Sequence, residues 1–403
     1  MAAEVLHIPD GINYECTGCG KCCGGWAIPM TDADFERISK KDWGAQLEMF
    51  AGQSLFRPLK KYEQEGSPYS HAIKVSTDGH CPFLVDNLCY MHSQYGSEFK
   101  PSICQLFPYC FSVTPSGVYT TVSFVSNGAL YNSGRALSDQ REYLEKKLSE
   151  FRKLFPDHNP NWSKLELTGG KPISWDDYLQ IEAQLIDCLK DSSTPFDQRM
   201  LKGSNFLIAK TRNAEAEAVG ELPPASSLKS LDRHLLIALH KTYYPLKLIG
   251  KGEGDFAVHR FLLQVLAGGA MTGSKVFVAG HSYSIEELHA VAWPQNDQEI
   301  EDLFFRYFYS RIFAKLYFGA GFGQLTMIAG YHHLVIMFAL MRLQSRALAK
   351  SRGVQTVAYI DVVTAVRQLE KRIGETAIGG YAAALYELLM FSPQRIRRII
   401  AAT

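Results

Sequence analysis

The sequence predicts an α+β protein that is mostly α-helical, with a small, irregular, Cys-rich N-terminal domain followed by a larger all-α domain. Eight of the nine cysteines lie in the first 110 residues, where Gly, Pro and Ser interrupt short apolar runs. From Ser138 onward, apolar residues recur at helical spacing instead. We expect a Cys-rich domain at residues 1–135, a helix and linker at residues 136–172, and a helical domain at residues 173–403.

Composition and charge narrow the classes of function. The chain has 403 residues, of which 46% are hydrophobic and 21% charged, as in ordinary globular proteins. Lys and Arg number 42 against 41 Asp and Glu, so the net charge of +1 provides no field that would attract nucleic acid or anionic lipid. We see no secretory signal before Tyr14 and no apolar run long enough to span a bilayer. We therefore expect a cytoplasmic protein with no nucleic-acid or membrane partner.

The Cys-rich domain contains few local signals for regular structure. Thr31 and Asp34 form a capping box, which predicts a helix from there to about Ser39. A second short helix is expected at residues 46–50, and strands are expected at residues 72–76 and 118–124. Because so little regular structure is expected, bound metal would supply much of the stability of this domain.

The rest of the chain reads as helices. A charged helix is predicted at residues 139–154, followed by a linker from Pro156 to Pro172. Ser174 and Asp177 form another capping box, and Cys188 lies on the apolar face of the helix that follows. The basic residues Arg395, Arg397 and Arg398 are expected at a solvated helix end. Further helices are predicted to begin at Thr194 and to cover about 228–242, 256–267, 285–292, 299–318, 324–351, 362–373 and 381–391, with Gly319, Gly353 and Gly374 as C-terminal caps.

The cysteines point to a metal centre. In a reducing compartment thiols rarely form stable disulfides, and uneven clustering in a large chain favours metal binding. We therefore take eight thiols as candidate ligands, and we expect Cys188, on the apolar face of its helix, to be a buried apolar thiol. The candidates are Cys16, Cys19, Cys22, Cys23, Cys81, Cys89, Cys104 and Cys110.

The spacing leaves the metal and the number of centres open. Cys16, Cys19 and Cys22 follow a C-x2-C-x2-C run like that of bacterial ferredoxins, which favours an iron–sulfur cluster, most simply 4Fe–4S. Zinc sites more often use separated C-x2-C pairs, and zinc remains the alternative. Eight thiols suffice for two four-thiolate centres, or for one centre with spare thiols. His80 is next to Cys81, and His92 lies three residues after Cys89, so both could supply imidazole ligands. We interpret them instead as ordinary polar neighbours of the cysteines, because the thiols already suffice.

The cysteine pattern resembles the CxxCxxCC family of zinc- or iron-chelating cysteine-cluster proteins, to which the flagellin lysine N-methylases belong. The first block of that pattern is Cys16, Cys19, Cys22 and Cys23. The second block is Cys81-Pro82-Phe83-Leu84, then Asn87-Leu88-Cys89, then Lys100-Pro101 with Cys104 and Leu106-Phe107-Pro108. The resemblance covers residues 14–110 closely, and beyond them it rests on chain length and aromatic-rich helical stretches.

The resemblance implies methyl transfer from S-adenosylmethionine to lysine side chains of a protein substrate, flagellin-like proteins included, with an iron–sulfur centre in the N-terminal domain. Two alternatives remain: a non-enzymatic zinc- or iron-chelating or redox-sensing protein, and an electron-transfer protein. The spacing differs from the C-x3-C-x2-C run of radical S-adenosylmethionine enzymes, so we expect a structural or redox-sensing cluster. No residue is nominated as catalytic or as binding S-adenosylmethionine.

Other motifs in the helical region are better explained by structure. The string Gly319-Ala-Gly321-Phe-Gly323 follows a predicted helix, whereas a nucleotide-binding glycine loop follows a strand. The glycines at 250, 252 and 254 read as a loop between helices. His332 and His333 fall within a helical pattern and are expected to be satisfied core or surface residues.

Overall fold

A computed structural model of the chain describes residues 4–24, 26–64, 66–77, 79–244, 275–373, 387–388 and 391–403. The helix expected at 256–267, most of the one at 381–391, the loop at 250–255 and the cap at Gly374 lie outside these residues. The protein is α+β and mostly helical, as the sequence predicts. It forms two units: Met1–Phe111 with Thr120–Asn159, and Ser112–Tyr119 with Pro160–Thr403. The domain limits at 135 and 172 stay predictions.

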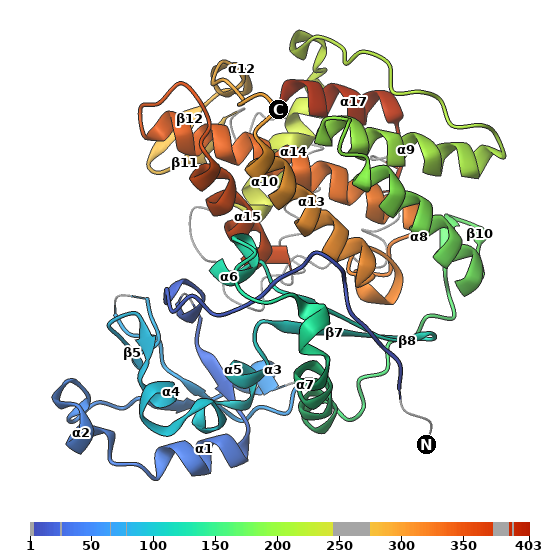
Figure 1. The fold of residues 1–403 in the computed structure, drawn as a ribbon. Coiled ribbons are helices and arrows are strands. Elements are labelled where there is room, and N and C mark those ends of the chain that lie inside the picture. The colour runs from blue at the N-terminus through green and yellow to red at the C-terminus, as the bar shows by residue number, and fades with distance from the viewer. Residues whose placement is uncertain are drawn as a thin grey trace. The chain divides into compact units, whose positions relative to one another are not determined.

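The first unit is built from short elements, drawn in blue to green in Figure 1. Strands β2, β4 and β3 form one antiparallel sheet, β5 and β6 form a hairpin, and β1, β8 and β7 form a second sheet in that order. The elements are β1 (Leu6–His7), η1 (Lys21–Cys23), β2 (Ile28–Met30), α1 (Asp32–Ser39), α2 (Trp43–Gln46), η2 (Glu48–Phe50), β3 (Phe56–Pro58), α3 (Lys61–Gln64), β4 (His71–Ile73), β5 (Leu84–Val85), β6 (Leu88–Cys89), α4 (Tyr90–Tyr95), η3 (Ser97–Phe99), α5 (Ser102–Leu106), β7 (Tyr109–Thr114), β8 (Gly117–Val122), α6 (Asn127–Leu130), η4 (Leu137–Gln140) and α7 (Arg141–Leu154).

An aromatic core holds these short elements together. Trp43 is buried, and its indole N–H donates to the Ile38 carbonyl at 3.0 Å. Its ring meets the Phe83 ring edge-on, with centroids 4.8 Å apart. Residues from β2, α1, η2, β4 and α4 close around this pair. Aromatic side chains bury much area each, so a small core can order many short segments.

Local signals in the first unit give mixed results. The capping box of Thr31 and Asp34 is present and begins α1. The single helix expected at 46–50 is wrong, because Leu47 is extended and separates α2 from the 3₁₀ turn η2. Asp42, not recognised in the sequence, caps α2 through the Ala45 N–H. The two expected strands exist as β4 and β8, with ends shifted by one to three residues.

The second unit is helical. The segment expected to be a linker contains the strands β9 and β10, and Leu165 and Leu167 within it are buried. The described elements are β9 (Glu166–Thr168), β10 (Lys171–Pro172), α8 (Trp175–Lys190), α9 (Phe196–Arg212), η5 (Ala225–Ser227), α10 (Ser230–Tyr243), β11 (Val276–Val278), β12 (His281–Tyr283), α12 (Ile285–His289), α13 (Gln298–Phe313), η6 (Gly319–Gly321), α14 (Met327–Ser351), α15 (Tyr359–Ile373) and α17 (Pro393–Ala402).

Helix α14 is the centre of the second unit (Figure 1). Most of its residues are apolar and none is exposed. It packs against α9, α10, α12, α15 and α17, which explains how so apolar a helix is covered. Within the described ranges, no helix combines the length and hydropathy needed to cross a bilayer.

Helix α17 corrects one expectation. Asp232 on α10 is 1% exposed and accepts hydrogen bonds from Arg395 and Arg398 of α17, at 2.8 and 2.6 Å. These two arginines therefore fasten α17 to α10, whereas a solvated helix end was expected. The sequence could not reveal this, because the acidic partner lies more than 160 positions earlier.

The β7–β8 hairpin has residues in both units. Its base, up to Phe111 and from Thr120, lies in the first unit, and its tip, Ser112–Tyr119, lies in the second. Within the second unit, the indole N–H of Trp162 donates to the tip carbonyl of Val113 at 2.7 Å.

Candidate metal centre

The first cysteine block lies on a loop shaped by glycines. Gly18 and Gly20 have φ of 62° and 65°, a left-handed conformation that other residues adopt at a cost. A Cβ on Gly18 would lie 3.1 Å from Leu88 Cδ2, and one on Gly20 would lie 2.9 Å from Leu84 Cδ2. The loop therefore packs directly on the β5–β6 hairpin, and glycine is needed both for backbone conformation and for space.

The hairpin brings the second cysteine pair together. Leu84 pairs with Cys89 across the hairpin. Asp86 and Asn87 form its turn with φ of 50° and 63°, values that Asp and Asn tolerate better than most residues. The Leu84 N–H donates to the Cys81 carbonyl at 3.0 Å, which holds Cys81 just before the first strand of the hairpin. Cys89 lies on its second strand.

A backbone hydrogen bond joins the two blocks. The Cys81 N–H donates to the Cys23 carbonyl at 3.0 Å, and Gly24 forms an antiparallel bridge with His80. A Cβ on Gly24 would lie 2.5 Å from His80 Nδ1. The imidazole of His80 thus packs against the cysteine loop, which the sequence alone did not indicate.

Cys104 approaches from a third segment. It lies on α5, and together with Cys89 it packs against the aromatic core that contains Cys81. The thiols of Cys23, Cys81, Cys89 and Cys104 therefore come from three separate segments. The charges of Cys81 and Cys89 contribute to the raised pKa of Cys104, and those of Cys81 and Cys104 to the raised pKa of Cys23.

The pKa shifts show how burial affects these thiols. The pKa of Cys23 is raised, first by a hydrogen bond with Cys22 and then by burial. Burial raises the pKa of Cys81 to about 12 and raises that of Cys104, and neighbouring thiols add to the shift of Cys104. A bound cation would reverse this preference, because metal ligation requires the thiolate.

The remaining candidates lie around this group. Cys16 is exposed, and Cys19 and Cys22 are half-buried on the loop. Tyr14 lies near Cys16 and Cys22, and its pKa is raised mainly by burial. Cys110 is on β7, with its Sγ 3.6 Å from the Pro108 carbonyl. In the second unit, Cys188 lies on α8 as expected but is only half-buried, whereas the sequence predicts a buried thiol.

The donor set suits a soft-metal centre. Thiolates are the preferred ligands of structural zinc and of iron–sulfur clusters. Within the described ranges, no three His, Cys, Asp or Glu side chains converge on one point as metal ligands would. Binding would therefore require the thiol side chains to turn toward a common point, and the assignment of eight ligands stays a prediction.

In the second unit, the glycine string at 319–323 and the histidines of α14 make packing and hydrogen-bond contacts. A Cβ on Gly321 would lie 1.9 Å from the Lys315 carbonyl oxygen, so this glycine serves a close backbone approach. His332 and His333 are buried on α14, and they hydrogen bond to Ser204 and Tyr243. These contacts explain both motifs without a ligand.

The second unit also contains a buried ion pair that has no local signal in the sequence. Lys315 is fully buried and donates to Glu182 Oε1 at 2.8 Å and to the Phe313 carbonyl at 2.7 Å. Its Nζ also lies 3.2 Å from the centroid of the Tyr119 ring. Burial lowers the pKa of Lys315 to about 8, and Glu182 opposes that shift. Glu182 and Tyr119 are both distant from Lys315 in sequence, so no local pattern reveals this pairing.

Comparison with known proteins agrees with the cysteine geometry. The sequence profile of the CxxCxxCC family, described as "Putative zinc- or iron-chelating domain", matches residues 15–123. An uncharacterized protein of Methanocaldococcus jannaschii is 26% identical over 220 residues, which is 53% of this chain and 71% of that protein. No solved structure matches the chain significantly. The matched span contains the cysteine loop, the β5–β6 hairpin and α5. The resemblance to the CxxCxxCC family is thus shown for residues 15–123 of the chain.

Proposed function

We propose that the first unit binds a metal centre through cysteine thiolates, with Cys23, Cys81, Cys89 and Cys104 as its central ligands. The observation that carries the proposal is the Cys81–Cys23 backbone hydrogen bond, because it places the first cysteine block beside the second. A 4Fe–4S cluster is our first choice of metal group, with zinc as the alternative. Cys16, Cys19, Cys22 and Cys110 would complete this centre or form a second one.

We further propose that the whole chain is a protein-lysine N-methyltransferase that uses S-adenosylmethionine in the cytoplasm. The support is the resemblance to flagellin lysine N-methylases and the size of the second unit, since chelation alone needs no large helical unit. The reaction is a direct displacement. A neutral lysine amine attacks the sulfonium methyl group, the methyl–sulfur bond breaks with S-adenosylhomocysteine as the leaving group, and the methylated ammonium can then lose a proton to solvent. The second unit would have to desolvate that lysine and align it with the methyl group.

The second candidate is a non-enzymatic zinc- or iron-chelating or redox-sensing protein. The family description favours it, because it names chelation and no reaction. The two candidates differ in whether the full chain binds S-adenosylmethionine. Electron transfer is a third reading, and it requires a reversible redox potential.

Anaerobic purification of the full chain, followed by iron, acid-labile sulfide and zinc analysis, tests the metal proposal. Iron and sulfide in equal amounts with a brown chromophore support a cluster, and zinc without colour supports a structural zinc site. If iron, acid-labile sulfide and zinc are all absent, both before and after reconstitution, metal binding is refuted. Calorimetric titration with S-adenosylmethionine then separates the methyltransferase, which binds it, from the chelating protein, which does not.

A further inference from the structure

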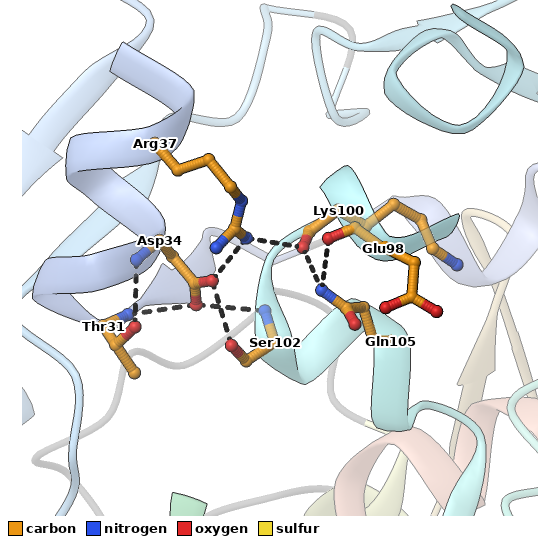
Figure 2. Close-up of polar contacts among 7 residues, drawn as sticks. All are labelled: Thr31, Asp34, Arg37, Glu98, Lys100, Ser102 and Gln105. Carbon is orange, nitrogen blue, oxygen red and sulfur yellow. Dashed lines mark hydrogen bonds and ion pairs between the residues drawn. The ribbon is translucent and has the colours of Figure 1, made fainter. Parts of the chain in front are cut away.

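Asp34 has more partners than a helix cap requires. It is fully buried and forms a capping box with Thr31 at the start of α1, and its Oδ2 lies 3.3 Å from the Thr31 N–H. Its Oδ2 also accepts from the Ser102 N–H at 3.0 Å, and its Oδ1 accepts from the Ser102 hydroxyl at 2.9 Å. Figure 2 shows these bonds crossing from α1 to the first residue of α5.

Arg37 strengthens the same junction. Its Nη2 donates to Asp34 Oδ1 at 2.7 Å and to the Lys100 carbonyl at 3.0 Å. The Lys100 carbonyl also accepts from Gln105 on α5 at 2.7 Å, as Figure 2 shows. The segment that leads into α5 is thus held on one side by Arg37 of α1, 63 positions earlier than Lys100, and on the other by Gln105 of α5 itself.

Another capping box in the chain shows what capping alone looks like. Ser174 and Asp177 cap α8, and Asp177 is exposed. Among the residues that the structure describes, its carboxylate hydrogen bonds only to Ser174. Asp34 is instead buried, because it serves two helices. Burying a carboxylate is costly unless hydrogen bonds and a counter-charge compensate it, and Ser102 and Arg37 supply them. The cost indicates that the position of α5 matters beyond the cap of α1.

We propose that Asp34 is a positioning residue of the metal centre, which holds α5 so that Cys104 stands beside Cys81 and Cys89 before metal binds. The inference rests on the proposed metal-binding function. Cys104 lies two residues after Ser102, so the Asp34–Ser102 bonds fix the backbone that carries this thiol. A ligand that is already ordered loses less conformational entropy on binding, which slows metal release.

The test uses the full chain with Co²⁺ as the probe, whose thiolate charge-transfer absorption reports on thiolate ligation. In Asp34→Asn the side chain keeps its size, but its NH₂ group cannot accept from Ser102 or Arg37. We expect cobalt release to a chelator to be about tenfold faster, since a hydrogen bond to a charged group is lost. Asp177→Asn, the matched control, removes a cap carboxylate from a helix that carries none of the candidate ligands, and should release cobalt at the wild-type rate.

A double-mutant cycle separates positioning from general destabilisation. If Asp34 acts through Cys104, Asp34→Asn should have no further effect on release in a Cys104→Ser background. An equal acceleration in both backgrounds, or no acceleration in either, would overturn the proposal. Ser102→Ala leaves the α1 cap intact and should accelerate release less, in the same direction, which keeps the test valid if Asp34→Asn fails to fold. A wild-type chain that takes up no cobalt, zinc or iron refutes the proposed function itself, and the positioning role with it.

Discussion

The backbone N–H of Cys81 donates a 3.0 Å hydrogen bond to the carbonyl oxygen of Cys23. Two cysteine motifs that are far apart in the sequence are thereby joined by the main chain, whichever metal they bind. Side chains at this junction should therefore affect metal content strongly, and Cys188 in the second unit should not.

Replacing Cys23 with Ser should remove most of the bound metal, because a hydroxyl is a poor ligand for soft metals. Cys188→Ser is the control, since that thiol lies on α8 in the second unit. Metal per chain, measured by mass spectrometry after anaerobic purification, checks the pair. Equal loss in both variants would show that the division of the thiols is wrong.

Gly20→Ala should destabilise the cysteine loop. A left-handed φ costs an alanine about 1 kcal/mol, and the new methyl group would also press on Leu84 Cδ2 at 2.9 Å. Gly11→Ala is matched, because Gly11 has φ of 72° but nothing within 4 Å of the added Cβ. Urea denaturation should show a loss larger by about 1 kcal/mol or more at Gly20. Identical losses would mean that the Leu84 side chain moves away from the new methyl group at no cost in free energy.

Lys315→Met should destabilise the second unit by about 3 kcal/mol, because it leaves the Glu182 carboxylate buried without its cation. Lys202→Met removes a lysine from a more exposed pair with Asp191, and should cost less than about 1 kcal/mol. Denaturant titration of both variants at pH 7 makes the comparison. Adding Glu182→Leu to Lys315→Met should recover part of the loss, and a further loss instead would contradict a paired role.

Acid should weaken the second unit through His240. Burial lowers the pKa of His240 to about 4, and its ring lies 2.9 Å from Gln344 Oε1. The unfolded chain, with an ordinary pKa of 6.5, then binds more protons, so stability falls as the pH drops from about 6.5 to 4. The full effect is about 3 kcal/mol.

His240→Gln isolates this contribution, because glutamine does not titrate. The free energy of unfolding, measured by denaturant between pH 7 and pH 4, should fall less in the variant than in the wild type. Part of the fall should remain, since burial also lowers the pKa of His333, to about 3. Parallel pH profiles for variant and wild type would show that His240 is protonated in the folded protein.

Much of the helical unit could be predicted from the sequence, because its signals are local. The capping box of Ser174 and Asp177 begins α8 as expected, and the apolar run after Thr326 forms α14. Gly353, with φ of 76°, follows the end of α14 as a C-terminal cap should. Apolar spacing and caps act over a few residues, so they are visible in one sequence.

The arrangement of the candidate centre was visible only in part. The spacing of the cysteines identified the candidate ligands, but not that Cys23 meets Cys81 or that α5 carries Cys104 toward both. Asp34 was recognised as a cap, whereas its bonds to Ser102 join residues 68 positions apart. Contacts of this kind depend on how segments pack, and no local pattern in a single sequence records them.

The shared β7–β8 hairpin bears on how such proteins arise. A domain that is gained or lost by recombination needs a boundary that few contacts cross. Here the family span at residues 15–123 includes the tip Ser112–Tyr119, which belongs to the helical unit. A gene that shed the helical unit would leave the Val113 carbonyl without the Trp162 indole. We therefore expect the hairpin tip and the helical unit to have been inherited together.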